Sequence, residues 1–160
     1  MSTIYRMPGH LIRRLQQISA SVFAERMQAL GVDLTSPQYA ALALLRDHPG
    51  IDQATLAGLI AHDRPTIGGV VERLAAKGLV ERRTSAADRR AKRLELTRRG
   101  ERLLARLEPV IAALQDEILP GLDRRERREF VRLAAKVVEA GNERSRAPLS
   151  APRAKRADVA

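Results

Sequence analysis

Cationic side chains that can pair with phosphate groups are concentrated between residues 88 and 97. Four of them follow one another closely, at Arg89, Arg90, Lys92 and Arg93. A short strand with alternating apolar residues begins at the last of these cations, and residues 78–83 can supply its partner strand. A hairpin with cations at its tip has little apolar surface to bury, so it is suited to binding a polyanion such as a nucleic-acid backbone.

The positive charge of the chain is localised. Its 160 residues include 29 Lys and Arg against 19 Asp and Glu, a formal net charge of +10. Between Arg64 and Arg99 there are 11 Lys and Arg against four Asp and Glu, and from Arg144 to the C-terminus there are five against one. The rest of the chain is therefore close to neutral, which favours a dedicated docking surface for a polyanion.

Composition argues against several classes of protein. The chain has no cysteine and only three histidines, which are not at metal-ligand spacing, so we expect neither a metal nor another cofactor. The sequence offers no nucleophile–base pair and no phosphate-binding loop, so we do not expect an enzyme. It also has no apolar run of ~18 residues and no signal-peptide pattern, from which we expect a cytoplasmic protein.

Apolar periodicity predicts a mainly α fold with one small β-hairpin. The expected helices span residues 8–30, 36–46, 53–61, 64–77, 97–118 and 123–140, and the expected strands span 79–84 and 93–97. Ser36 is expected to cap the second helix, and Asp123 with Glu126 the last one. Pro109 is expected to kink the fifth helix. Periodicity is lost after Gly141, so residues 142–160 are predicted to form a flexible basic tail.

The third and fourth predicted helices are separated by a short turn, as in a helix-turn-helix. The second helix of such a pair enters the major groove of DNA with its N-terminal residues first. Its inward face is expected to consist of Ile67, Val70, Val71 and Leu74. The residues expected to meet DNA from this helix are Arg64, Pro65, Thr66, Gly68, Gly69 and Arg73.

These motifs together resemble the multiple-antibiotic-resistance regulator (MarR) family of bacterial repressors. The resemblance is carried by residues 56–57, 66–67, 71–74, 77–82, 88–91 and 96–100, the last being a Leu-Thr-x-x-Gly motif. It implies one domain over residues 1–141, with a winged helix-turn-helix at about 36–97. The helices at about 8–30, 98–118 and 123–140 would then form the dimerisation region.

The resemblance also assigns roles within the hairpin, which would be the wing. Arg90 would insert into the minor groove of DNA with Asp88 holding it in position, and Arg89 and Lys92 would lie on the same wing. The negative potential of a narrow minor groove attracts guanidinium groups. A solvent-exposed surface cation is the alternative for Arg90. The acidic residue often found at the wing entrance is missing, with Ser85 near its place.

The sequence departs from the family at Gly68 and Gly69, where polar or basic residues are usual. Two glycines within a helix cost on the order of 1 kcal/mol each relative to alanine. One interpretation is a close approach of the helix backbone to DNA, with recognition of DNA shape in place of side-chain contacts. The other is a local weakness without a special role. The sequence leaves both interpretations open.

A ligand site is suggested by the first predicted helix. His10, Arg14 and Gln17 form a polar stripe beside an apolar one, and a cation next to an apolar wall suits a ligand with a carboxylate and a ring. Tyr39 can close such a pocket. In the family, small aromatic acids or phenols commonly bind between the dimerisation helices and the DNA-binding head. A surface salt bridge for Arg14 and a helix-start role for His10 are the alternatives.

We therefore expect a sequence-specific DNA-binding transcription regulator. The resemblance implies a homodimeric repressor on a pseudo-palindromic operator, released by a small aromatic or heteroaromatic carboxylate effector. The alternative is an architectural, nucleoid-type DNA-binding protein without an effector. Such a protein would share the basic charge but would show little preference for one site and no response to a ligand.

Overall fold

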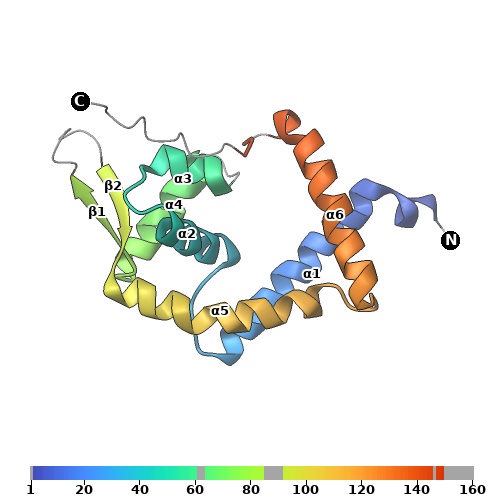
Figure 1. Ribbon diagram of the computed structural model, residues 1–160, viewed down its shortest axis with the longest axis horizontal. Coiled ribbons are helices and arrows are strands. Elements are labelled where there is room, and N and C mark those ends of the chain that lie inside the picture. The colour runs from blue at the N-terminus through green and yellow to red at the C-terminus, as the bar shows by residue number, and fades with distance from the viewer. Residues whose placement is uncertain (1, 61–63, 85–91, 146, 150–160) are drawn as a thin grey trace.

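The fold was analysed in a computed structural model, which describes residues 2–60, 64–84, 92–145 and 147–149. Its elements are the 3-10 helix η1 (Thr3–Arg6), α1 (Pro8–Ala29), α2 (Ser36–Asp47), α3 (Gln53–Ile60), α4 (Arg64–Ala76), β1 (Val80–Thr84), β2 (Lys92–Leu96), α5 (Arg98–Ile118), α6 (Arg124–Ala140) and the 3-10 turn η2 (Asn142–Arg144). Helices α2, α3 and α4 and the hairpin form a head at one end, and α5 leads from it to α6 at the other (Figure 1). The predicted mainly α fold with one hairpin is confirmed.

Helix α2 begins with a cap that differs by one residue from the prediction. Thr35, rather than Ser36, is the N-cap, and its hydroxyl accepts a hydrogen bond of 3.4 Å from the backbone N–H of Gln38. The Gln38 side chain accepts in return from the Thr35 N–H at 3.1 Å. This reciprocal capping box requires Glu or Gln three residues after the cap. Ser36 lacks that partner because Tyr39 occupies the position.

The other predicted helix starts agree with the structure. The Asp52 carboxylate accepts a 2.7 Å hydrogen bond from the Thr55 N–H at the start of α3. Asp123 caps α6 and forms the expected box with Glu126, whose carboxylate accepts from the Asp123 N–H at 2.9 Å. Pro109 lies within α5, which remains one helix from Arg98 to Ile118. Local capping chemistry therefore accounts for where these helices begin.

The hydrophobic core lies between the head and α5. Its fully buried side chains include Leu42 and Leu45 from α2, Leu56 from α3, Ile67, Val71 and Leu74 from α4, Leu94 from β2, and Leu104, Leu107 and Leu114 from α5. Helix α1 contributes only Phe23 and Met27 to the buried set, both from its C-terminal half. The N-terminal half of α1 therefore adds little to the core of a single chain.

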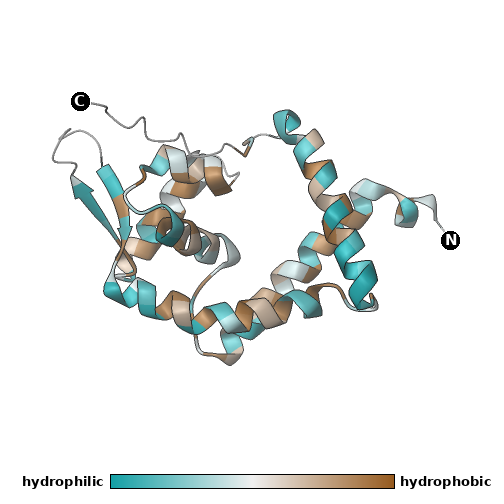
Figure 2. Ribbon diagram, in the orientation of Figure 1, coloured by the Kyte–Doolittle hydropathy of each residue, from teal (hydrophilic) through white to brown (hydrophobic). Residues whose placement is uncertain are grey.

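Helix α6 has an apolar face that the described part of the chain does not cover. The sequence predicts a core-facing side that includes Leu133, Val137 and Val138, but these side chains are 46%, 65% and 64% exposed. None of the residues of α6 is buried. Figure 2 shows hydrophobic segments along α6 and the beginning of α1, away from the head. Periodicity identifies an apolar face correctly, but the described residues leave this face largely exposed.

The hairpin is held against the helices of the head by a third segment, which the sequence did not predict. Strands β1 and β2 are antiparallel, with Val80 opposite Leu96 and Thr84 opposite Lys92. Ile51 forms an isolated bridge with Leu94 through a Leu94 N–H to Ile51 carbonyl bond of 2.9 Å. The Leu94 carbonyl in turn accepts from the Gly50 N–H at 3.0 Å. The loop between α2 and α3 thus fixes the orientation of the hairpin.

The Leu-Thr-x-x-Gly motif joins the base of the hairpin to α5. The Thr97 hydroxyl donates to the Gly78 carbonyl at 2.7 Å and accepts from the Gly100 N–H at 3.1 Å. A Cβ atom on Gly100 would lie 2.2 Å from the carbonyl oxygen of Leu79, far inside van der Waals contact. Only glycine fits this close approach of two backbones, which explains why the motif has glycine at its last position.

Three interhelical ion pairs connect α5 to its neighbours. Arg26 of α1 pairs with Glu117, Arg46 of α2 with Glu108, and Arg127 of α6 with Asp116. These side chains are partly exposed, so each pair contributes little to the free energy of unfolding and mainly sets helix orientation. No helix within the described residues is both long and apolar enough to cross a membrane.

Candidate nucleic-acid interface and ligand pocket

Helix α4 presents the residues expected to meet DNA on its outward side. Ile67, Val71 and Leu74 are completely buried, which confirms the predicted inward face. Pro65, Thr66 and Arg73 are exposed, whereas the backbone positions Gly68 and Gly69 are half-buried. The helix begins at Arg64, as expected. The turn before it, residues 61–63, and the side chain of Arg64 lie outside the described part of the chain.

A glycine in α4 leaves open space on the surface of the helix. A Cβ atom on Gly69 would have no neighbouring atom within 4 Å, while one on Gly68 would lie 3.4 Å from the Gln53 side-chain nitrogen. Gly69 is two residues from both Ile67 and Val71, which places it ~200° around the helix from each of these buried residues. It therefore faces away from the core, toward the side on which DNA would bind.

The hairpin supplies exposed cations beside α4. Lys92 is exposed at the start of β2, and Arg82 is exposed on β1 with no carboxylate partner among the described residues. Asp88, Arg89 and Arg90 lie outside the described residues, so their predicted roles remain predictions. Arg82 was not among the predicted DNA-binding residues. The adjacent Arg82 and Arg83 could have indicated it, because neighbouring residues of a strand point to opposite faces. Of these two, only Arg83 is on the same face as Glu81 and Glu95.

Arg83 and Arg93 are used within the protein. The Arg83 guanidinium donates to Glu81 at 2.6 and 2.9 Å and lies 3.3 Å from a Glu95 oxygen. The hydrogen bond that Arg83 donates to Glu81, and then the charges of Glu81 and Glu95, raise the pKa of Arg83 above its ordinary value. Arg93 donates to the Gly50 carbonyl at 3.2 Å. Both arginines therefore brace the hairpin, and Arg82 and Lys92 are left to face a ligand.

The arrangement of α4 and the hairpin relative to α5 is that of a winged helix-turn-helix. The C-terminal end of α4, the base of the hairpin and the start of α5 meet at Gly78, Leu79 and Thr97. The N-terminal end of α4 and the open end of the strands project away from α5 (Figure 1). A helix N-terminus and an adjacent hairpin on one side match the major groove and a flanking groove of B-DNA.

A second candidate region is a cavity of about 510 Å³ at the start of α1. Two of the predicted ligand residues, His10 and Arg14, line it, and so do the apolar side chains Leu11, Leu15 and Ile18. Tyr5 of η1 also lines it, and its ring makes an edge-to-face contact with His10 at a centroid distance of 5.6 Å. An apolar wall, an aromatic edge and a guanidinium group match the chemistry of an aromatic carboxylate.

The other two predicted ligand residues lie elsewhere. Gln17 is exposed on α1 and does not line the cavity. Tyr39 packs against Phe23 at a centroid distance of 6.3 Å, at the edge of the core. Burial raises the pKa of the Tyr39 hydroxyl, and the charge of Arg46 partly opposes this shift. Tyr5 and Arg13 line the cavity instead. Apolar periodicity gave no signal for Tyr5 because it belongs to a 3-10 turn that precedes α1.

The cavity beside His10 is open on one side. Its lining residues come from η1 and α1, so the part of the chain that the structure describes supplies only one wall. Specific ligand sites usually enclose most of the ligand surface. A second wall therefore has to come from another element or another copy of the chain. Within the described residues, no group of three or more His, Cys, Asp and Glu side chains can hold a metal ion.

Comparison with known proteins agrees with this geometry. A sequence profile of the MarR family matches residues 34–92. The chain is 36% identical over 131 residues to the transcriptional repressor NicR of Pseudomonas putida, covering 82% of each protein. Its fold is similar to the PcaV transcriptional regulator from Streptomyces coelicolor in complex with its natural ligand. That comparison has a TM-score of 0.76 and 35% identity, covering 88% of this chain and 98% of PcaV.

A third similar protein is BpsR of Bordetella bronchiseptica, whose DNA binding is regulated by 6-hydroxynicotinic acid. Its structure matches with a TM-score of 0.77 and 30% identity, covering 83% of this chain and 94% of BpsR. The matches include both the head and the helices that flank it, so they extend well beyond a helix-turn-helix alone. The chain therefore belongs to the MarR family, and it is a DNA-binding transcription regulator rather than an enzyme.

Proposed function

We propose that this protein is a homodimeric repressor that binds a pseudo-palindromic operator and is released by a small aromatic or heteroaromatic carboxylate. Being related to bacterial regulators, it is expected to act in the cytoplasm, where bacterial DNA lies. The observation that carries the proposal is the apolar surface next to the His10–Arg14 cavity. One chain leaves both this surface and the cavity incomplete, so a second copy can complete them together.

Exposed apolar side chains occur on η1, α1 and α6. Tyr5 and Ile12 are 57% and 60% exposed, and Val137 and Val138 of α6 are 65% and 64% exposed. Exposed apolar residues gathered on two long helices are typical of a protein–protein interface. A two-fold axis through this end would place two heads side by side, ~34 Å apart, to read successive major grooves.

The effector is expected to bind with its carboxylate near Arg14 and its ring against Leu11, Leu15 and Ile18. Charge-assisted hydrogen bonds from a guanidinium group fix the orientation of a carboxylate, and the apolar wall favours a ring. BpsR, whose DNA binding is regulated by 6-hydroxynicotinic acid, supports a ligand of this kind. A ligand between two copies would change the separation of the heads, and only one separation fits the operator.

The proposal is tested with an operator selected by the protein itself from a random duplex pool. The oligomeric state is measured by light scattering, and operator affinity by fluorescence anisotropy with 6-hydroxynicotinic acid and hydroxybenzoic acids as probes. Arg14→Ala should remove the ligand response and keep operator binding. The matched control is Arg6→Ala, because Arg6 is exposed in η1 but does not line the cavity.

Different results separate this function from its alternative. A monomer in solution would rule out the homodimer. An absence of any ligand response together with equal affinity for all duplexes would favour an architectural DNA-binding protein. A full ligand response in Arg14→Ala would place the effector elsewhere while leaving the repressor function intact.

A further inference from the structure

A separate cavity lies where the head meets the start of α5. It has a volume of about 580 Å³, and its walls are the loop between α1 and α2, the connection between α4 and β1, and the first turns of α5. Four of its lining residues are cationic: Lys77, Arg99, Arg102 and Arg106. The only acidic one is Asp33, so the walls carry a net charge of +3.

Asp33 is already neutralised, which leaves the arginines without a counterion. The Lys77 ammonium lies 2.8 Å from the Asp33 carboxylate and donates to the Asp33 carbonyl at 2.6 Å. Arg99, Arg102 and Arg106 have no ion pair and no hydrogen bond to any other described residue. Three neighbouring guanidinium groups repel one another, and bound anions relieve that repulsion.

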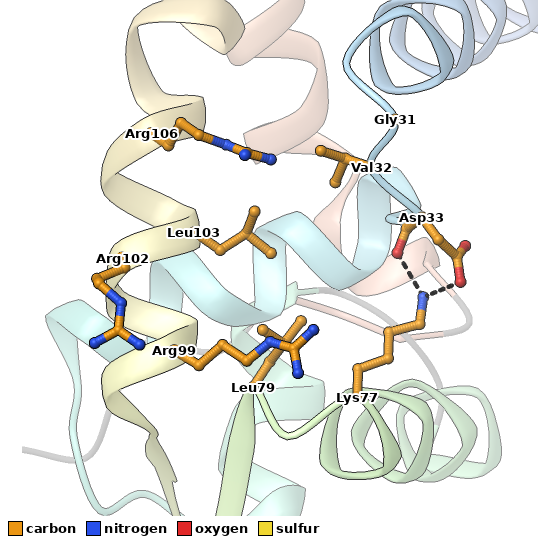
Figure 3. Close-up of a pocket in the computed structure, with 9 residues that line it drawn as sticks. All are labelled: Gly31, Val32, Asp33, Lys77, Leu79, Arg99, Arg102, Leu103 and Arg106. Atoms are coloured by element: carbon orange, nitrogen blue, oxygen red, sulfur yellow. Dashed lines mark hydrogen bonds and ion pairs between the residues drawn. The ribbon is translucent and has the colours of Figure 1, made fainter.

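Two of the arginines point into the same space. Arg99 and Arg106 extend from α5 toward the α1–α2 loop and Lys77, with the Leu103 side chain between them (Figure 3). Arg102 lies on the flank of the helix, away from this loop. Arg99 and Arg106 are seven residues apart, so their backbones are separated by about 10 Å along the helix axis. The surface between them is apolar and includes Val32, Leu79 and Leu103.

We propose that this cavity binds a small dicarboxylic acid, with one carboxylate on Arg99, the other on Arg106, and an aliphatic or aromatic middle against Leu103. The planar fork of each guanidinium donates two parallel hydrogen bonds to a carboxylate. The apolar wall discriminates against inorganic polyanions, which have no carbon skeleton to place there. The spacing of the two arginines discriminates against monocarboxylates.

DNA is not the expected occupant. Lys77 follows the C-terminal end of α4, and Leu79 lies at the base of the hairpin. The N-terminal end of α4, 13 residues and about 20 Å away, and the open end of the strands form the DNA side of the head. A duplex bound there would be remote from the arginines of α5.

A second copy of the chain is not the expected occupant either. The exposed apolar residues of η1, α1 and α6 lie beyond the other end of α5, where Asp116 contacts Arg127 (Figure 1). The cavity is lined by four of the first nine residues of α5, and none of its lining residues comes from α6 or from the N-terminal half of α1. A second copy packed on the apolar faces would therefore be far from the cavity. To reach it, an acidic segment of that copy would have to extend along most of the length of α5.

Occupancy of the cavity is expected to stabilise the folded protein. One of its walls belongs to α5 and the others to the head and the α1–α2 loop, so a bound dianion links them. A ligand that binds only the folded state raises the melting temperature by mass action. Because the arginines are exposed, the affinity should fall as the salt concentration rises.

The experiment measures binding of malonate, glutarate and adipate to the full chain by isothermal titration calorimetry at low salt. Butyrate and inorganic phosphate serve as anion controls, and an acidic peptide serves as the protein-like control. The double variant Arg99→Gln/Arg106→Gln is compared with Arg102→Gln, which removes a charge on the flank. Arg14→Ala reports on the separate cavity at the start of α1. All these residues are exposed, so the variants should fold.

We expect the longer dicarboxylates to bind more tightly than malonate, butyrate and phosphate. The double variant should weaken this binding by about tenfold or more, since it removes hydrogen bonds to a charged group. Arg102→Gln should weaken binding much less than the double variant, since it removes only part of the positive charge, and Arg14→Ala should bind nearly as well as the unaltered chain. No binding of any dicarboxylate, equal binding by the double variant, loss of binding in Arg14→Ala, or binding of the acidic peptide alone would each overturn the proposal.

Discussion

Replacing Gly69 by alanine should make the protein more stable and its DNA binding weaker. Glycine within a helix is less favourable than alanine by about 1 kcal/mol. The added Cβ would meet no atom within 4 Å, so nothing offsets this gain. We therefore expect the free energy of unfolding to rise by about 1 kcal/mol, equivalent to a melting-temperature increase of about 2–4 °C for a chain of this size.

The same methyl group would occupy the outward side of α4, the recognition helix that is expected to enter the major groove. If the helix backbone packs closely against DNA, inserting a methyl group into that contact should cost about 1–3 kcal/mol of binding free energy. Stability and affinity would then change in opposite directions. A general loss of structure would lower both the stability and the DNA affinity, so it could not produce this result.

The assay combines urea denaturation with titration of a labelled operator at fixed salt. Gly68→Ala is the matched control, because its Cβ would contact the Gln53 side chain at 3.4 Å within the head. A decrease in stability for Gly69→Ala would refute our account of the open space. An increase in stability with unchanged operator affinity would refute the close approach to DNA and leave the glycine pair as a tolerated weakness.

Three further changes test other parts of the interface. Arg90→Ala should weaken operator binding by about 1–3 kcal/mol with unchanged stability, measured by the same titration; equal affinity would show that this arginine does not enter a groove. Gly100→Ala should lower the free energy of unfolding by about 1–3 kcal/mol in urea, because its Cβ would clash with the Leu79 carbonyl; unaltered stability would contradict the close approach. Removal of residues 150–160, which include three Lys and Arg, should weaken binding to all duplexes alike and reduce the salt dependence of that binding, measured by the same titration. Loss of oligomerisation would instead show that this segment has a structural role.

Much of the fold could be predicted because its elements begin and end with local signals. Asp52, Thr97 and Asp123 each cap a helix through contacts within three residues, so the sequence alone contains the relevant chemistry. The one-residue error at α2 has the same origin. Both Thr35 and Ser36 can cap a helix, and only the position of Gln38 decides between them.

Contacts between distant segments could not be predicted in this way. The bridge from Ile51 to Leu94 involves one residue on each side, too few to produce a periodic pattern. The position of Tyr39 depends on its packing against Phe23, a neighbour in space but not in sequence. Tyr5 reaches His10 through a 3-10 turn whose direction no apolar pattern encodes.

The segment after Gly141 illustrates the same limit. Its composition predicts a flexible tail from residue 142 onward, and residues 150–160 lie outside the described part of the chain. The structure shows a 3-10 turn over Asn142–Arg144. The Asn142 side chain accepts from the Leu149 N–H at 2.7 Å and donates to its carbonyl at 3.1 Å. A single amide side chain can thus order a short segment that has no periodicity.

The junction at Thr97 and Gly100 links the interface to the rest of the protein. The Thr97 hydroxyl binds the Gly78 carbonyl at the end of α4, and Gly100 lets α5 contact the Leu79 backbone. The recognition helix, the hairpin and α5 therefore meet at one point with little room to move independently. A rotation of α5 should carry the recognition helix and the hairpin with it. If ligands bind at the two proposed sites, the one between Arg99 and Arg106 would act directly on the first turns of α5, and the one near Arg14 would act through α1. Both would be expected to change the position of the head without touching DNA.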